Sequence, residues 1–163
     1  MKSSPVASPL QNHPYQKATV ATTHRTVPIA VTEYNLVSFE AGDDELSMTQ
    51  SLNALYIADT IGQMIVSGVQ IANQWNLANG TTSSGTDYGL VDADDYSPFP
   101  QFYAMAMWGA TGDTLLDVDI ARERVDLADR VRVYPTRRAD GSFAVVLLNL
   151  DDDPIEFDLA LPG

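Results

Sequence analysis

Cysteine is absent from this chain of 163 residues, and histidine occurs only twice, at His13 and His24. The lack of cysteine excludes disulfide bonds. Neither histidine has the spacing of metal ligands or a nearby Ser or Cys nucleophile motif, so metal-ion and catalytic-triad chemistry are not expected. The sequence also lacks a P-loop, a Gly-rich dinucleotide motif and any apolar run long enough to cross a membrane. No cofactor is therefore expected.

Basic residues are also scarce, and the net charge is −13. Residues 36–112 contain nine acidic residues and no Lys or Arg. This charge distribution argues against nucleic acid, phosphorylated ligands and anionic polymers, which Lys or Arg normally bind. Adaptation to salt would produce the same acidity, so the charge does not by itself identify a ligand.

The N-terminal residues 1–26 are polar and contain Pro and Ser, which predicts an irregular segment. They lack the apolar core of a secretory signal peptide, so we expect a soluble protein and favour the cytoplasm. The compartment otherwise stays open, because a chain without cysteine suits either redox environment.

The most informative segment is residues 27–35, with the sequence VPIAVTEYN. An apolar, β-branched run ends there in one carboxylate, Glu33, followed by Tyr34 and Asn35. Buried parallel strands read as continuous apolar runs, and functional residues of (β/α) barrels lie where such strands end. Glu33 is therefore a candidate catalytic residue. The alternative is a surface Glu in the loop after an ordinary buried strand.

A long helix and a second strand follow. Residues 46–66 contain no Pro and have apolar residues at helical spacing, in two neighbouring stripes that predict a wide buried face. The first stripe contains Leu52, Leu55 and Tyr56, and the second contains Ala54, Ile57, Ala58, Ile61, Met64 and Ile65. Residues 69–72 then form a short apolar strand that ends in Asn73, Gln74 and Trp75. The order strand, helix, strand is typical of a βαβ unit with parallel strands.

Parallel neighbours place their carboxyl ends at the same edge of a sheet. We therefore expect one pocket lined by Glu33, Tyr34, Asn35, Asn73, Gln74 and Trp75. A carboxylate with an indole face, amides and a phenol suits a sugar, whose C–H faces stack on aromatic rings while its hydroxyls bind polar groups. The alternative for Trp75 is a large residue that fills a sheet edge.

These segments resemble a known family. Residues 29–35, IAVTEYN, resemble the seventh barrel strand of clan A glycoside hydrolases, most closely those of α-L-arabinofuranosidases. In that family the terminal Glu, here Glu33, is the nucleophile of a retaining mechanism. Residues 71–75, IANQW, resemble the eighth strand, whose aromatic residue lines the sugar subsite. The resemblance implies Glu33 as catalytic residue and Tyr34, Asn35, Asn73, Gln74 and Trp75 as substrate-binding residues.

Two further segments, YGLV at residues 88–91 and PFPQFYAM at residues 98–105, resemble the loop and final barrel helix of the same enzymes. The resemblance spans about residues 25–160 and rests on the order and spacing of the motifs. It implies an α/β fold in which residues 27–110 are the last two βα units of a (β/α)8 TIM barrel. The implied ligand is a neutral oligo- or polysaccharide of the plant cell wall.

After Thr111 the pattern changes to alternation with a period of two. Residues 114–120, 130–134, 143–148 and 155–159 predict short antiparallel strands, and Asp140 and Gly141 predict a hairpin turn. Strands of this spacing are typical of a β-sandwich, so residues 113–163 are expected to form part of one. A sandwich follows the barrel in arabinofuranosidase-like enzymes. The acidic residues at 151–153 are interpreted as a solvated turn in preference to a calcium site.

The predicted elements are too few for a whole enzyme. A (β/α) barrel takes about 250 residues, and a retaining glycosidase needs a second carboxyl about 5–5.5 Å from the nucleophile. In the resembled family that residue follows the fourth strand, and no Glu here has that setting. Two hypotheses remain. The chain is either the C-terminal part of a glycoside hydrolase, inactive alone, or a non-catalytic carbohydrate-binding or accessory protein. Its protein partner would be a separate chain that supplies the rest of the barrel, or another copy of itself.

Overall fold

The computed structural model describes residues 27–38, 43, 45–81, 86–119 and 122–160. The irregular segment predicted for residues 1–26 lies outside these residues. The chain divides into two compact units, Met1–Gly109 and Ala110–Gly163. This division lies next to the change of sequence pattern that follows Thr111.

The first unit contains, in chain order, β1 (Ile29–Tyr34), the 3₁₀ helix η3 (Ser47–Thr49), α2 (Ser51–Val66), β2 (Val69–Gln74) and α3 (Pro100–Trp108). Strands β1 and β2 pair in parallel, with Val31 opposite Ala72 and Tyr34 opposite Gln74. The predicted adjacent parallel strands are therefore confirmed. Because the strands run in the same direction, their carboxyl ends lie at one edge of the pair.

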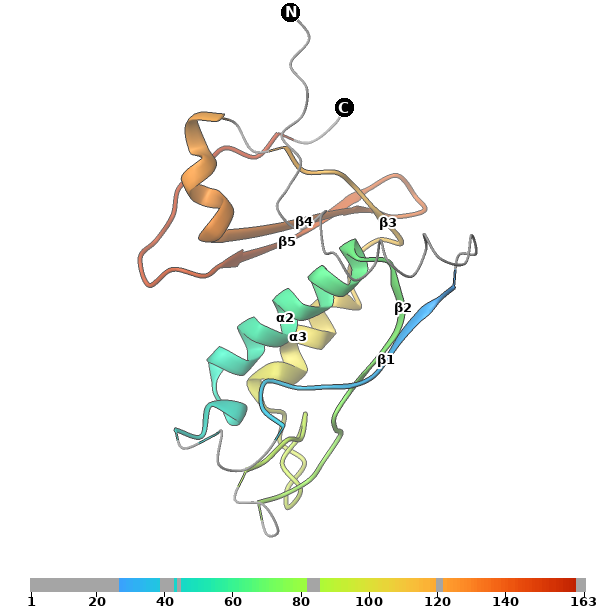
Figure 1. The fold of residues 1–163 in the computed structure, drawn as a ribbon, viewed down its shortest axis with the longest axis vertical. Coiled ribbons are helices and arrows are strands. Elements are labelled where there is room, and N and C mark those ends of the chain that lie inside the picture. Colours follow the sequence, from blue (N-terminus) through green and yellow to red (C-terminus); the bar gives the residue numbers. More distant parts are fainter. Residues whose placement is uncertain (1–26, 39–42, 44, 82–85, 120–121, 161–163) are drawn as a thin grey trace, which may run out of the picture. The chain divides into compact units, whose positions relative to one another are not determined.

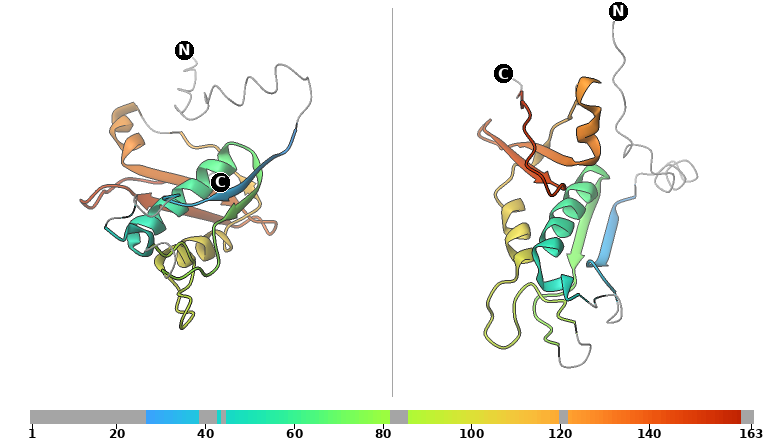
Figure 2. Two further views of the ribbon diagram at one scale, coloured as in Figure 1. Left: turned by 60° about the horizontal axis from the view of Figure 1, so that its bottom comes forward. Right: turned by 90° about the vertical axis from the view of Figure 1, so that its left-hand side faces the viewer.

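Both helices lie on one side of the β1–β2 pair, and α2 packs against α3 (Figures 1 and 2). Pro100 occupies the first turn of α3, where its missing N–H costs no helical hydrogen bond. At the other end of α3, the Trp108 indole N–H donates a 3.0 Å hydrogen bond to the carbonyl of Ala58 in α2. This bond satisfies the polar atom of a buried aromatic residue and fixes the two helices to each other.

Helix α2 begins later and buries a narrower face than the sequence predicted. Gln50 has an extended backbone, so the α-helix starts at Ser51, after the short turn of η3. Ile57 and Ala58 are buried, whereas Leu52 is 56% exposed and Tyr56 is 37% exposed. The prediction that Leu52, Leu55 and Tyr56 are buried is wrong for the described residues. Within this unit α2 contacts α3, β2 and η3, and these contacts leave the first apolar stripe uncovered.

The second unit contains β3 (Thr114–Leu115), the 3₁₀ helix η4 (Arg122–Asp129), β4 (Val131–Arg137) and β5 (Phe143–Asn149). The three strands form an antiparallel sheet in the order β3, β4, β5. The predicted antiparallel pairing of the strands at 130–134 and 143–148 is confirmed. The buried apolar side chains of this unit are Val131, Tyr134, Val146 and Leu148 from the sheet, together with Leu127.

The predicted hairpin turn is also confirmed. Gly141 has φ +87°, a conformation that favours glycine, and Arg138 and Ser142 close the turn with a 2.8 Å backbone hydrogen bond. Two other predictions for this unit are wrong. The strand predicted at residues 114–120 is limited to Thr114–Leu115, and residues 155–159 form no strand. Alternation alone does not make a strand where no neighbouring strand accepts its hydrogen bonds.

An ion pair anchors the acidic turn after β5. The Arg130 guanidinium donates a hydrogen bond to the Asp151 carboxylate, and the Leu150 amide donates one of 2.8 Å to the Arg130 carbonyl. The hydrogen bond from Arg130 holds the pKa of Asp151 below its ordinary value. The acidic residues at 151–153 therefore belong to a turn that the ion pair and the backbone hydrogen bond fix to Arg130, directly before β4.

Candidate functional site

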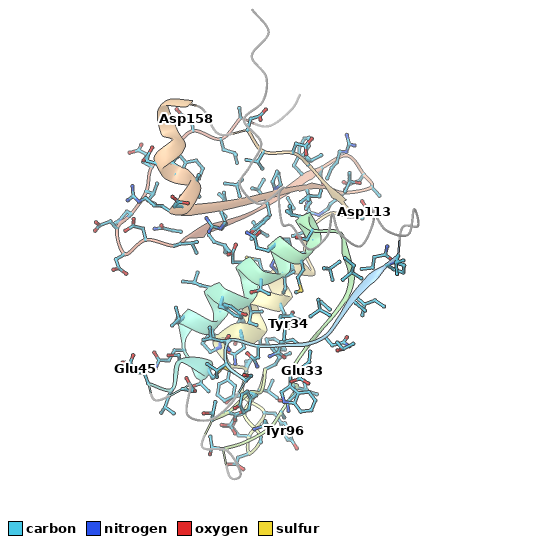
Figure 3. All side chains as sticks on the ribbon, viewed as in Figure 1. Glu33, Tyr34, Glu45, Tyr96, Asp113 and Asp158 are labelled. Atoms are coloured by element: carbon cyan, nitrogen blue, oxygen red, sulfur yellow. The ribbon has the colours of Figure 1, made fainter. Side chains whose placement is uncertain are left out.

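The candidate site lies where β1 and β2 end. Figure 3 shows Glu33 and Tyr34 at the carboxyl end of β1. The Trp75 backbone amide donates a 3.0 Å hydrogen bond to the Tyr34 carbonyl, which extends the pairing of the strands by one residue. This ladder brings residues some forty positions apart in the sequence to one edge of the unit. It places a carboxylate and an indole at the same edge.

A cavity of about 400 Å³ opens at this edge. It is lined by Glu33, Tyr34, Asn35, Val37, Ser38, Trp75, Asn79 and Tyr88. Three of these residues are aromatic, Glu33 is the single carboxylate, and none is Lys or Arg. The volume is that of a small-molecule site, and the lining combines apolar ring faces with a few polar groups.

Four of the six residues predicted for the site line this cavity, namely Glu33, Tyr34, Asn35 and Trp75. Glu33 is exposed, and in the described residues no hydrogen bond joins its carboxylate to Tyr34, Asn35, Asn73 or Gln74. The carboxylate oxygens are thus accessible to a ligand. Trp75 is 49% exposed, so part of its ring is also open to contact.

Asn73 and Gln74 do not line the cavity. Asn73 is exposed. The Gln74 side-chain amide donates to the carbonyls of Trp75 at 2.9 Å and Tyr88 at 3.5 Å. Gln74 therefore holds backbone in place at the edge of the site.

Asn35 lines the cavity, but its polar atoms are already bonded within the protein. Its side-chain amide nitrogen donates to the carbonyls of Trp75 and Tyr88, the latter at 3.1 Å. Its side-chain oxygen accepts the Leu36 amide at 2.8 Å and the side-chain amide of Asn53 at 3.5 Å. Asn53 is fully buried in α2. Asn35 thus connects the ends of both strands to the helix behind them.

Tyr34 contributes a phenol that stays protonated over a wide pH range. Burial is the larger cause and the nearby Tyr56 phenol the smaller one, and together they raise the pKa of Tyr34 above its ordinary value of 10.0. At neutral pH the hydroxyl is therefore a hydrogen-bond donor as well as an acceptor. Such a group suits an uncharged, hydroxyl-rich ligand.

The sequence did not assign Val37, Ser38, Asn79 and Tyr88 to the site. Tyr88 lies in the segment after β2, and the Asn76 amide donates a 3.1 Å hydrogen bond to the Tyr88 carbonyl. The signal available in the sequence was the Tyr88–Gly89 pair. A Cβ on Gly89 would lie 2.6 Å from the Val91 carbonyl oxygen, so only glycine allows the chain to fold back so closely.

Two further findings bear on the kind of site. The described parts of the chain hold no group of three or more His, Asp or Glu side chains that could bind a metal ion. None of the helices in those parts has both the length and the apolar character needed to cross a lipid bilayer. No protein-family model matches the chain, and no curated protein matches it either.

Proposed function

We propose that the chain is the C-terminal part of a retaining glycoside hydrolase that cleaves arabinofuranosidic or similar bonds in plant cell-wall polysaccharides. The observation that carries the proposal is the shared cavity of Glu33 and Trp75, at the ends of two adjacent parallel strands. A carboxylate beside aromatic faces supplies the nucleophile and the sugar-binding surface of such an enzyme, and a second carboxyl is needed as acid and base. The absence of Lys and Arg from the cavity lining supports a neutral ligand in preference to an anionic one.

In this proposal the barrel is a (β/α)8 TIM barrel, and β1 and β2 are its seventh and eighth strands. The parallel order β1, α2, β2, α3 supports this assignment. The antiparallel sheet of the second unit is assigned to part of the β-sandwich that follows the barrel in arabinofuranosidase-like enzymes. The rest of the barrel would come from a longer form of the protein or from a separate chain.

Glu33 is assigned the role of nucleophile. Its carboxylate oxygen attacks the anomeric carbon, and the bond from that carbon to the leaving-group oxygen breaks. A second carboxylic acid gives its proton to the leaving oxygen and then activates the water that releases the sugar. The described cavity contains Glu33 as its one carboxylate, so the second carboxyl must come from outside the described residues. The isolated chain is therefore expected to lack appreciable activity.

The same observation favours a second candidate function, that of a non-catalytic carbohydrate-binding or accessory protein. A cavity with one carboxylate and three aromatic residues binds a sugar without needing to cleave it. Both functions predict that the chain binds neutral saccharides, and they differ in whether a second carboxyl completes the site.

The reading frame upstream of Met1 separates the two functions. An Asn-Glu pair after a further apolar strand, well before Glu33, would support the hydrolase. The extended protein should then hydrolyse aryl arabinofuranosides, and the extended Glu33→Gln variant should not. A frame without such a pair, together with saccharide binding by the chain, would favour the binding protein. A chain that binds no neutral saccharide would contradict both functions.

A further inference from the structure

The backbone at Tyr88 is fixed by an unusual number of hydrogen bonds. Its carbonyl oxygen accepts from the Asn76 amide at 3.1 Å, from the Asn35 side chain at 3.1 Å and from the Gln74 side chain at 3.5 Å. The donors come from the end of β1, the end of β2 and the residues after it. A residue in an ordinary surface loop has no such set of partners.

The neighbours of Tyr88 are held in the same way. The Gly89 amide donates to the Asp87 carboxylate at 2.8 Å, and the Gln101 side chain donates to the Gly89 carbonyl at 2.7 Å. Gln101 is fully buried in α3, and Asp87 is 6% exposed. Tyr88 therefore lines the cavity from a backbone that both strands and a helix hold in place. Binding groups held by such a rigid support lose little entropy when a ligand binds.

Asn35 connects Tyr88 to Trp75. Its side-chain nitrogen donates to the carbonyls of both residues, and the side-chain nitrogen of Gln74 donates to the same two carbonyls. An Asn side chain has two N–H donors and one acceptor oxygen, and Asn35 uses all of them on protein partners. It has little remaining capacity to bind a sugar, contrary to the role that the sequence suggested.

We propose that Tyr88 is a second aromatic binding face, which together with Trp75 holds one sugar ring beside Glu33, and that Asn35 is a positioning residue for both aromatic residues. The inference rests on the proposed function, because it names further binding residues of the same site. The ligand is a neutral saccharide, whose C–H faces contact the two rings.

The binding face is tested by titrating the dilute chain with an arabinofuranosyl-substituted xylo-oligosaccharide and following tryptophan fluorescence. Tyr88→Ala should weaken binding about tenfold, whereas Tyr88→Phe, which keeps the ring, should stay within about twofold of the unsubstituted chain. Tyr96→Ala is the matched control, because Tyr96 is 72% exposed and does not line the cavity.

The positioning role is tested without a ligand, by acrylamide quenching of fluorescence. The sequence has two tryptophans, and Trp108 is buried, so quenching reports mainly on Trp75. Asn35→Asp replaces the donors with an oxygen that repels both carbonyls, and it should change the quenching and weaken saccharide binding. Asn73→Asp makes the same change of charge outside the cavity and should alter neither. If Asn35→Asp does not fold, Asn35→Ala removes the donors without adding charge and carries the same expectation.

The outcomes separate the inference from the proposed function. If Tyr88→Ala binds as well as the unsubstituted chain while Trp75→Ala does not bind, the second face is refuted and the proposed function stands. If Asn35→Asp and Asn73→Asp are quenched alike, the positioning role is refuted. If the unsubstituted chain binds no saccharide, the proposed function fails, and the binding role of Tyr88 fails with it.

Discussion

The backbone amide of Trp75 donates a 3.0 Å hydrogen bond to the carbonyl oxygen of Tyr34. This bond lies one residue beyond β2 and continues its parallel pairing with β1. The relative position of the indole and the end of β1, where Glu33 lies, is therefore set by the backbone ladder and does not depend on flexible side chains. Sites built on strands in this way are more rigid than sites built on loops.

Glu33 is expected to be essential for turnover in the complete enzyme. Glu33→Gln keeps the shape of the side chain and removes the anionic nucleophile, so turnover of an aryl arabinofuranoside should fall by several orders of magnitude with little loss of binding. Glu33→Ala leaves room for azide, which should attack the activated substrate from the vacated side. The product, identified by NMR, should be a glycosyl azide of inverted configuration.

A matched control for this prediction is Glu45→Gln, because Glu45 is exposed and does not line the cavity. Its turnover should equal that of the unsubstituted enzyme. Near-normal turnover by Glu33→Ala, or an azide product of retained configuration, would show that Glu33 is not the nucleophile.

Trp75→Ala is expected to affect binding more than chemistry. Loss of the indole face should weaken saccharide binding by about 1–3 kcal/mol. Titration calorimetry of the variant against the same oligosaccharide measures this change directly. Equal affinity of the variant and the unsubstituted chain would instead support the alternative in which Trp75 only fills the sheet edge.

The isolated chain is expected to self-associate or to unfold with weak cooperativity. In the described residues β1 and β2 pair only with each other, and Ile71 is 58% exposed. Two parallel strands with open edges and an uncovered face promote association. A mostly apolar cavity of about 290 Å³ also opens beside these strands and the two helices, and it adds to the uncovered apolar surface of the unit.

Light scattering after size exclusion tests this expectation. Ile71→Lys places a charge on the uncovered strand face and should reduce association. Leu159→Lys is the control, since Leu159 is 44% exposed and lies outside the strands. A monomeric chain with a single sharp thermal transition would contradict the prediction.

Tyr34 is expected to reduce stability at high pH. Its folded pKa is raised by burial above the ordinary value of 10.0. Below pH 10 the phenol is protonated in both states, and its contribution to stability is complete. Above that pH the unfolded chain loses the proton first, so the free energy of unfolding falls as the pH rises through the folded pKa.

Urea unfolding at pH 7 and at about pH 10.5 measures this loss. Tyr34→Phe has no proton to lose, so it should lose less stability between the two pH values than the unsubstituted chain. Tyr96→Phe, at an exposed position, serves as the control. An equal loss in the two variants would exclude Tyr34 as the cause.

Local sequence patterns correctly predicted a strand and a hairpin turn. The apolar run that ends at Glu33 predicted β1, and the Asp140–Gly141 pair predicted the hairpin between β4 and β5. The same reasoning failed at residues 155–159, where a strand-like alternation forms no strand. A strand depends on a partner with free hydrogen-bonding groups, and alternation does not reveal whether that partner exists.

The sequence by itself determined that two parallel strands deliver Glu33 and Trp75 to one edge, because chain order and strand direction fix that geometry. Only the tertiary structure decided which groups the polar residues beside Glu33 and Trp75 bind. Asn35 and Gln74 look like sugar ligands in the sequence, but they bond to the carbonyls of Trp75 and Tyr88. Tyr88 lines the cavity, and residues distant in the sequence hold its backbone there. Contacts of this kind depend on packing between segments, which no local pattern encodes.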